Sequence, residues 1–207
     1  MAAPEQDRPP LPNAGALRDP QVPLVVLDIC SVETYFLAQP LTWLAVERDG
    51  AVWCPLASPP GPLDLDRESA ARVARRVQLP LVWPERHPAP VPRAMRVAAL
   101  ACSRGFGARC MFGLSRMAFG GGADLEDPEQ YLLAVEESDV TAQEATLAAQ
   151  DRTGWAAKLL TMAQELRELG ISAAPALRLE GRLYLGTRAI APVLGRSPSH
   201  QPTLDLS

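Results

Sequence analysis

The sequence predicts an α/β fold in which a long helical segment separates two groups of strands. Two apolar runs with an amphipathic stretch between them form a strand–helix–strand unit within about 35 residues, a size typical of such units. Several helical segments follow, and a hairpin pattern comes near the end of the 207 residues. The expected order is therefore β-α-β, several helices, then β-β-α.

The first unit begins with a strand that is expected to be buried on both faces. Residues 23–29 (PLVVLDI) form a continuous Val-rich run, which is typical of a strand in a parallel sheet. A helix is expected after this strand, and Pro40 favours a kink in that helix or a late start of it. Residues 51–57 (AVWCPLA) are expected to form the second strand. Between the two strands, apolar residues recur at the spacing of one helix face, at Leu37, Leu41, Leu44 and Ala45.

The helical segment carries start and stop signals. Two Ala-rich helices are expected over residues 93–104 and 108–119, and three consecutive glycines end the second. Gly170 predicts the end of the last helix before the chain returns to β structure. Helix starts are predicted by capping residues at Asp66, Asp127 and Thr141, the last with Glu144 as a capping box.

The end of the chain is expected to form a hairpin and a short helix. Residues 175–180 and 182–185 form the two strands, joined by a turn at Glu180 and Gly181. Residues 187–194 are expected to be helical, and residues 195–207 to form a tail.

The composition excludes several classes of protein. A net charge of -4 and a pI near 5.3 argue against an electrostatic nucleic-acid binder, which needs a basic footprint. No apolar run approaches the roughly 20 residues that span a bilayer. The Pro-rich residues 1–22 lack a signal-peptide pattern and are expected to be a disordered lead. A cytoplasmic location without a membrane partner is therefore expected.

The cysteine pattern favours buried thiols in a reducing compartment. None of the four cysteines forms a C-x-x-C motif, and no spacing is typical of a zinc site. No metal site is therefore predicted. The four positions are Cys30, Cys54, Cys102 and Cys110.

The stretch LDICSVETYF resembles the opening of the DsbA-like thioredoxin-fold family. The resemblance is to its branch of 2-hydroxychromene-2-carboxylate isomerases and kappa-class glutathione transferases. That opening is an apolar strand, Asp, two residues, then Cys-Pro-x-Cys-Tyr in redox members or Ser-Pro-x-x-Tyr in isomerases. Asp28 matches the acid, Ser31 stands at the reactive position and Tyr35 at the aromatic one. Val32 and Thr34 replace the Pro and the second Cys.

Later segments extend the resemblance over residues 23–194. LPLVWPERHPAPVPRAMRVAALACSRG resembles the entry to the family's helical insertion. FGGGADLEDPEQ resembles the gap between the insertion helices. LGISAAPALRLEGRLYLGT resembles the final strands. The resemblance implies one thioredoxin-like domain with an all-helical insertion over about residues 64–154. It also implies a homodimer, which is common in this branch.

The resemblance further implies a site at the start of the first helix. Ser31 would be catalytic, with its hydroxyl holding the sulfur of glutathione, or of another low-molecular-weight thiol, as a thiolate. The thiolate would attack a small electrophile, which makes the protein a thiol-dependent isomerase or transferase. A cis Ala174–Pro175 bond would bring backbone groups to the bound thiol. Further binding residues would be Thr34, Tyr35 and Arg188.

Departures from the family pattern leave two alternatives open. Without cysteines at positions 31 and 34, dithiol cycling through C-x-x-C is not available. Cys30 is expected to face away from Ser31, because adjacent side chains at a strand end point opposite ways. Glu33 in the first helical turn disfavours a nearby thiolate. The alternatives are a redox-inactive binding module and an atypical monothiol oxidoreductase that uses Cys30.

Other residues have simpler interpretations. Ser31 as a plain N-cap is a further possibility. His87 is expected to be a surface or loop histidine, and Trp83 is a candidate for the wall of a cleft below the insertion.

Overall fold

The computed structural model describes residues 14–37, 50–57, 65–136 and 140–189. A helix begins at residue 32, soon after the first strand, and continues to residue 37, where that described stretch ends. Most of the predicted face of this helix lies outside the described residues, as do the predicted C-terminal tail and most of the last predicted helix.

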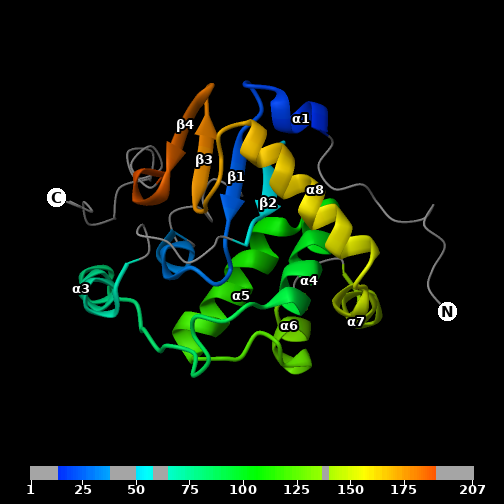
Figure 1. Ribbon diagram of the computed structural model, residues 1–207. Helices are drawn as coiled ribbons and strands as arrows, with labels where there is room; N and C mark the ends of the chain where they lie inside the picture. Colours follow the sequence, from blue (N-terminus) through cyan, green and yellow to red (C-terminus); the bar gives the residue numbers. More distant parts are fainter. Residues whose placement is uncertain (1–13, 38–49, 58–64, 137–139, 190–207) are drawn as a thin grey trace.

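Four strands form one mixed sheet in the spatial order β2-β1-β3-β4 (Figure 1). β1 (Leu24–Leu27) pairs in parallel with β2 (Val52–Pro55) and antiparallel with β3 (Ala176–Leu179). β3 pairs antiparallel with β4 (Arg182–Leu185). Parallel neighbours require a crossover connection, so the parallel β1–β2 pair confirms the predicted strand–helix–strand unit. The β3–β4 hairpin is confirmed as well.

β1 lies between two hydrophobic cores because successive side chains of a strand point to opposite faces. Val25 and Leu27 belong to the larger core, which the insertion helices fill. Leu24 and Val26 belong to the smaller core, which includes side chains of α8 (Gly154–Glu168). Full burial of each such side chain contributes about 1.5–3 kcal/mol to the free energy of folding. This short strand therefore stabilises the packing on both faces of the sheet.

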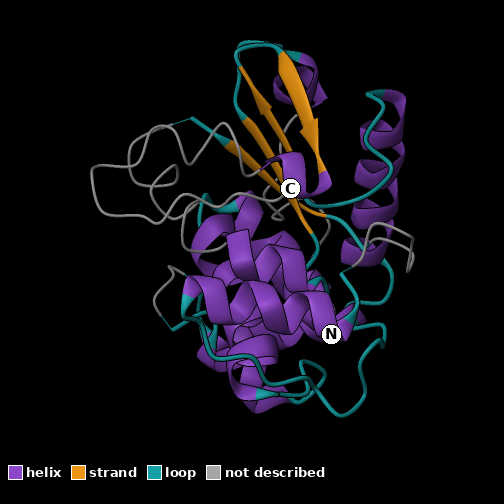
Figure 2. Ribbon diagram, turned by 90° about the vertical axis from the view of Figure 1, so that its left-hand side faces the viewer, coloured by secondary structure: helices purple, strands orange, loops and turns teal. Residues whose placement is uncertain are grey.

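The helical insertion is built around α4 (Pro92–Ser103). Nine consecutive residues of α4, from Ala94 to Cys102, are buried. The many Ala side chains among them let α5 (Gly107–Gly121), α7 (Ala142–Gln150) and α8 pack closely against α4. α4, α5 and α6 gather at one end of the sheet, whereas α8 runs beside it (Figures 1 and 2). The remaining insertion helices are α3 (Arg67–Val77) and α6 (Pro128–Leu133).

The predicted helix starts and stops are confirmed. The side chains of Asp66 and Asp127 accept hydrogen bonds from backbone N–H groups in the first turns of α3 and α6. Thr141 and Glu144 form both bonds of a capping box at the start of α7. α5 ends at Gly122, whose φ of 70° is the left-handed conformation that favours glycine.

The prediction that residues 1–22 are disordered is wrong for residues 14–22. Residues 14–18 form the short helix α1 (Ala14–Arg18), and the Leu17 side chain is buried in the smaller core. The guanidinium of Arg178 on β3 donates to the backbone carbonyls of Leu17, at 2.7 Å, and of Val22, at 3.2 Å. The composition of residues 1–22 does not predict this contact, because Arg178 is far away in the sequence.

Replacing Arg178 with Met is expected to lower the free energy of unfolding by about 2–3 kcal/mol, because several backbone carbonyls lose a charged donor. It should also make residues 14–22 accessible to proteases. Urea unfolding and limited proteolysis measure both effects. Arg182→Met on the exposed strand β4 is the control, with an expected change within about 0.5 kcal/mol. Equal stability of the two variants would contradict the anchoring role of Arg178.

Candidate functional site

The chain turns sharply between β1 and the helix that follows it. β1 ends at Leu27, and residues 28–31 form a turn before the helix begins at residue 32. The carboxylate of Asp28 accepts a hydrogen bond from the Cys30 N–H at 2.8 Å, and its carbonyl accepts from the Ser31 N–H at 3.0 Å. Asp28 therefore holds the turn that places Ser31 at the start of the helix.

Ser31 and Glu33 form a buried polar pair at this helix start. The Ser31 hydroxyl donates to Glu33 Oε2 over 2.6 Å, and both residues are less than a tenth exposed. The other carboxylate oxygen, Oε1, accepts from the backbone N–H of Leu65, just before α3. Glu33 thus connects the helix start to the entrance of the insertion. It also occupies the one hydrogen-bond donor of the Ser31 hydroxyl.

A cavity of about 950 Å³ opens beside this pair. Its wall consists of the turn that carries Ser31, the end of β2, the loop before α4, α4 itself and one face of α8. Cys30, Ser31 and Glu33 all line it. The cavity therefore lies between the sheet layer and the helical insertion.

The sequence predicts that Cys30 faces away from Ser31, whereas the structure places both residues in the wall of one cavity. The alternation of side chains applies to an extended strand, whereas residues 29 and 30 already belong to a turn. Burial raises the pKa of the Cys30 thiol far above its ordinary value, and the carboxylates of Asp28 and Glu126 raise it further. The thiol donates to the Ala89 carbonyl over 3.7 Å.

Two predicted binding residues of the first helix point into the core. Thr34 is fully buried, and its hydroxyl has no hydrogen-bond partner among the described residues. The Tyr35 hydroxyl donates to the Pro80 carbonyl over 2.5 Å, and its ring lies 6.2 Å from that of Phe119. Burial raises the pKa of Tyr35. Neither residue is among the described residues that line the cavity.

The predicted binding residues near the C-terminus are also separate from this cavity. The Ala174–Pro175 peptide bond is cis. The Pro175 carbonyl accepts from the Gly186 N–H over 2.8 Å, and Ala174 packs against the smaller core. Arg188 is exposed on the 3-10 helix η2 (Gly186–Ala189). Of the predicted site residues, the described cavity therefore brings together Ser31 and Cys30 alone.

The loop before α4 supplies cavity residues that the sequence did not identify. His87, predicted to be a surface or loop histidine, lines the cavity and has a cis bond to Pro88. Its ring lies 4.9 Å from that of Trp83 and 5.4 Å from that of Phe119. Trp83 lines the cavity, as expected, with the Arg67 guanidinium 5.1 Å from its ring centre. A Pro-rich loop gives no periodic signal from which these contacts follow.

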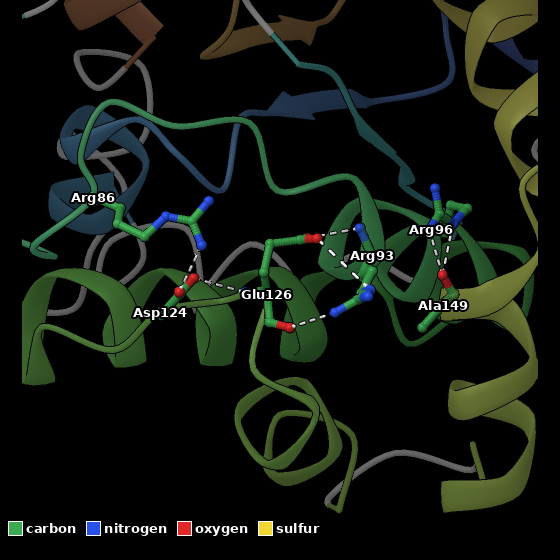
Figure 3. A network of polar contacts seen from close by, with 6 residues as sticks. All are labelled: Arg86, Arg93, Arg96, Asp124, Glu126 and Ala149. Atoms are coloured by element: carbon green, nitrogen blue, oxygen red, sulfur yellow. Dashed lines mark hydrogen bonds and ion pairs between the residues drawn. The ribbon is translucent and has the colours of Figure 1, made fainter.

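A polar network fixes this loop to the segment between α5 and α6 (Figure 3). Arg86 forms an ion pair with Asp124 at 3.1 Å, and the Asp124 carboxylate accepts from the Glu126 N–H at 3.0 Å. Glu126 in turn accepts from the Arg93 N–H at 2.8 Å. These bonds tie Arg86 of the loop and the first turn of α4 to the same segment, which holds the cavity wall that carries His87 in place.

Two further searches of the structure gave negative results. Among the described residues, no group of three or more His, Cys, Asp or Glu side chains is arranged to hold a metal ion. None of the helices within the described ranges combines the length and the hydropathy that crossing a bilayer requires.

Comparison with known proteins shows a fold but no close relative. No protein-family model and no curated protein matches the sequence. Among solved structures, 2-hydroxychromene-2-carboxylate isomerase superposes with a TM-score of 0.62 at 14% identity, covering 84% of this chain and 93% of the isomerase. A probable DsbA oxidoreductase from Streptomyces coelicolor superposes with a TM-score of 0.59 at 16% identity, covering 87% of this chain and 92% of that one.

A third neighbour is the cytosolic disulfide reductase DsbM from Pseudomonas aeruginosa, solved with GSH. Its TM-score is 0.57 at 16% identity, with coverage of 84% of this chain and 96% of the reductase. The chain therefore has the α/β thioredoxin-like fold of DsbA-like proteins, with a helical insertion. The same fold carries isomerase and redox activities in these neighbours, so activity must be inferred from the site.

The raised pKa of Cys30 predicts slow alkylation by iodoacetamide at neutral pH. A higher pKa leaves less thiolate, so the rate should be at least about tenfold below that of an unperturbed thiol. The rate should continue to rise as the pH passes about 8.5, the ordinary pKa of cysteine, instead of reaching a plateau. Mass spectrometry of the labelled protein measures this, with the urea-unfolded chain as the control. Equal rates in the folded and unfolded chains would show that Cys30 is reactive.

Proposed function

We propose that the protein is a thiol-dependent isomerase or transferase that acts on a small electrophile. The observation that carries the proposal is the position of Ser31, whose hydroxyl stands at a helix start beside a cavity of about 950 Å³. A bound thiol, with glutathione as the first candidate, would supply a nucleophilic sulfur. Ser31 would donate a hydrogen bond to that sulfur, and the positive end of the helix would further favour its negative charge.

Cys30 is poorly suited to replace an external thiol. Its pKa is raised by burial and by two carboxylates, so the reactive thiolate is scarce at neutral pH. The three other cysteines are buried, and burial raises the pKa of Cys54 and Cys110 to about 12. These properties weigh against the monothiol oxidoreductase that uses Cys30.

The cavity residues fit a thiol such as glutathione in part. The volume is sufficient for a tripeptide, and Arg67, Arg96 and Arg167 line the cavity as possible partners for its carboxylates. The Ser31 hydroxyl, however, donates to Glu33 in this structure. Binding of a thiolate therefore requires Ser31 to release Glu33 and to turn its donor toward the sulfur, which the Glu33 charge opposes.

The Ser31–Glu33 bond also supports a second candidate function. At 2.6 Å it is a short, charge-assisted hydrogen bond that satisfies the Ser31 hydroxyl within the protein. A thioredoxin-fold module that binds a ligand or a partner in the cavity, without turnover, would keep this pair intact. Such a module needs no thiol and would be insensitive to removal of the Ser31 hydroxyl.

Glutathione at millimolar concentration is expected to raise the melting temperature of the protein, and Ser31→Ala is expected to weaken the binding by about tenfold, the value of one charged hydrogen bond. Differential scanning fluorimetry over a range of glutathione concentrations measures both. Ser103→Ala is the matched control, because the Ser103 hydroxyl donates to the Leu100 carbonyl within α4. The absence of any shift for the wild-type protein would favour the non-catalytic module.

Glu33→Gln is expected to lower the pKa of a bound glutathione thiol by about one unit, because it removes a negative charge close to the sulfur. Gln retains an acceptor for the Leu65 N–H, so the helix start should stay in place. The ultraviolet absorbance of the thiolate, followed as a function of pH, measures the change. Glu129→Gln on the exposed side of α6 serves as the control. An unchanged or raised thiol pKa in Glu33→Gln would place the bound sulfur away from Ser31.

A further inference from the structure

Residues 14–22, here called the strap, hold the C-terminal end of α8 as well as the sheet. The strap includes α1, which packs against α8 (Figure 1). Its Leu17 side chain is buried in the smaller core, and the Leu17 carbonyl accepts from the Arg178 guanidinium at 2.7 Å. Arg18 forms an ion pair with Glu168, the last residue of α8, at 2.7 Å. The strap is therefore attached both to β3 and to the end of α8.

The two halves of α8 belong to different cores. Trp155, near the start of the helix, is buried in the larger core. Met162 and Leu166, in the C-terminal half, are buried in the smaller core, which also contains Leu17 of the strap. Among the described elements, the main packing partners of α8 are α4 and α1. The C-terminal half of α8 thus depends on the strap for part of its packing.

The same half of α8 forms part of the cavity wall. Leu160, Ala163 and Arg167 line the cavity, and Ala163 also packs against the smaller core. Leu56, after the end of β2, is buried in the smaller core and lines the cavity as well. The smaller core therefore touches both the strap and the cavity. Because such cores are closely packed, a loss of strap contacts is transmitted through these side chains to the cavity wall.

The attachment of the strap is weaker than that of the strands beneath it. α1 has only 5 residues, whereas isolated helices shorter than about 12–15 residues are marginal in water. Both side chains of the Arg18–Glu168 pair are at least half exposed, and an exposed ion pair contributes little to stability. Segments with few buried contacts open locally while the core stays folded. The strap can accordingly leave its place without unfolding of the sheet.

We infer that the strap is a conformational device that controls the cavity: its docking holds the α8 wall in place, and its release lets the C-terminal half of α8 move and opens the cavity. The coupling is reciprocal, so a ligand that contacts the α8 wall would in turn favour the docked strap. The inference is independent of the reaction in the proposed function, because it concerns only the packing of α8.

Hydrogen exchange and alkylation of the full-length protein test this coupling with two matched variants. Leu17→Ala in the strap and Leu114→Ala in α5 remove the same buried side chain, and neither residue lines the cavity. Leu17→Ala should speed exchange of the amides of residues 160–168 by at least about tenfold relative to residues 92–103 of α4. It should also speed iodoacetamide labelling of Cys30, the one partly exposed cysteine, which lines the cavity. Leu114→Ala should show neither selective effect.

A charge exchange at the surface tests the direct link between the strap and α8. Arg18→Glu places two like charges together at the end of α8 and should speed exchange of residues 160–168 by about threefold. Adding Glu168→Arg restores an opposite pair, so the double variant should return to the wild-type rate. Both positions are exposed, so these variants should fold even where Leu17→Ala does not.

The inference is overturned by unchanged exchange of residues 160–168 in Leu17→Ala, or in Arg18→Glu where Leu17→Ala does not fold. The same selective increase in Leu114→Ala would also overturn it, since the effect would then reflect lower stability alone. Faster exchange in α8 with unchanged labelling of Cys30 would show that the strap holds the helix but does not control the cavity. Faster exchange and faster labelling in Leu17→Ala alone would establish the coupling.

Discussion

The burial of β1 on both faces is the constraint on which the rest of the structure depends. Val25 and Leu27 belong to the core shared with the insertion, while Leu24 and Val26 belong to the core shared with α8. A shift of this strand by one residue would exchange the two sets, so its register is strongly specified. That register fixes where the strand ends, at Leu27, and therefore where the chain turns toward the cavity.

At this turn, one carboxylate has a structural and a chemical effect at once. Glu33 accepts a hydrogen bond from the backbone N–H of Leu65, before α3, and another from the Ser31 hydroxyl. In the proposed function, a thiolate at Ser31 would therefore compete with the neighbouring carboxylate of Glu33. Burial, together with the carboxylates of Asp28 and Glu126, holds the pKa of Cys30 high. The raised pKa leaves little thiolate at neutral pH, so Cys30 is poorly suited to act as an internal nucleophile.

The central helix α4 joins the packing of the insertion to the charge of the cavity. Its small side chains allow neighbouring helices to approach, and this places the end of α7 against Arg96. The helix end orients the guanidinium but neutralises only part of its charge. One side of the cavity is consequently cationic, the face formed by α8 is apolar, and the turn at Ser31 is acidic.

The sequence by itself determined the order of the elements, the caps at Asp66, Asp127 and Thr141, and the absence of a C-x-x-C dithiol. These features depend on residues within a few positions of one another, so local patterns are sufficient to predict them. Only the tertiary structure decided the place of Cys30 in the cavity wall, the anchoring of residues 14–22 by Arg178, and the contribution of His87 and Arg96 to the cavity. Each of these depends on a backbone turn or on a partner far away in the sequence, which no local pattern records.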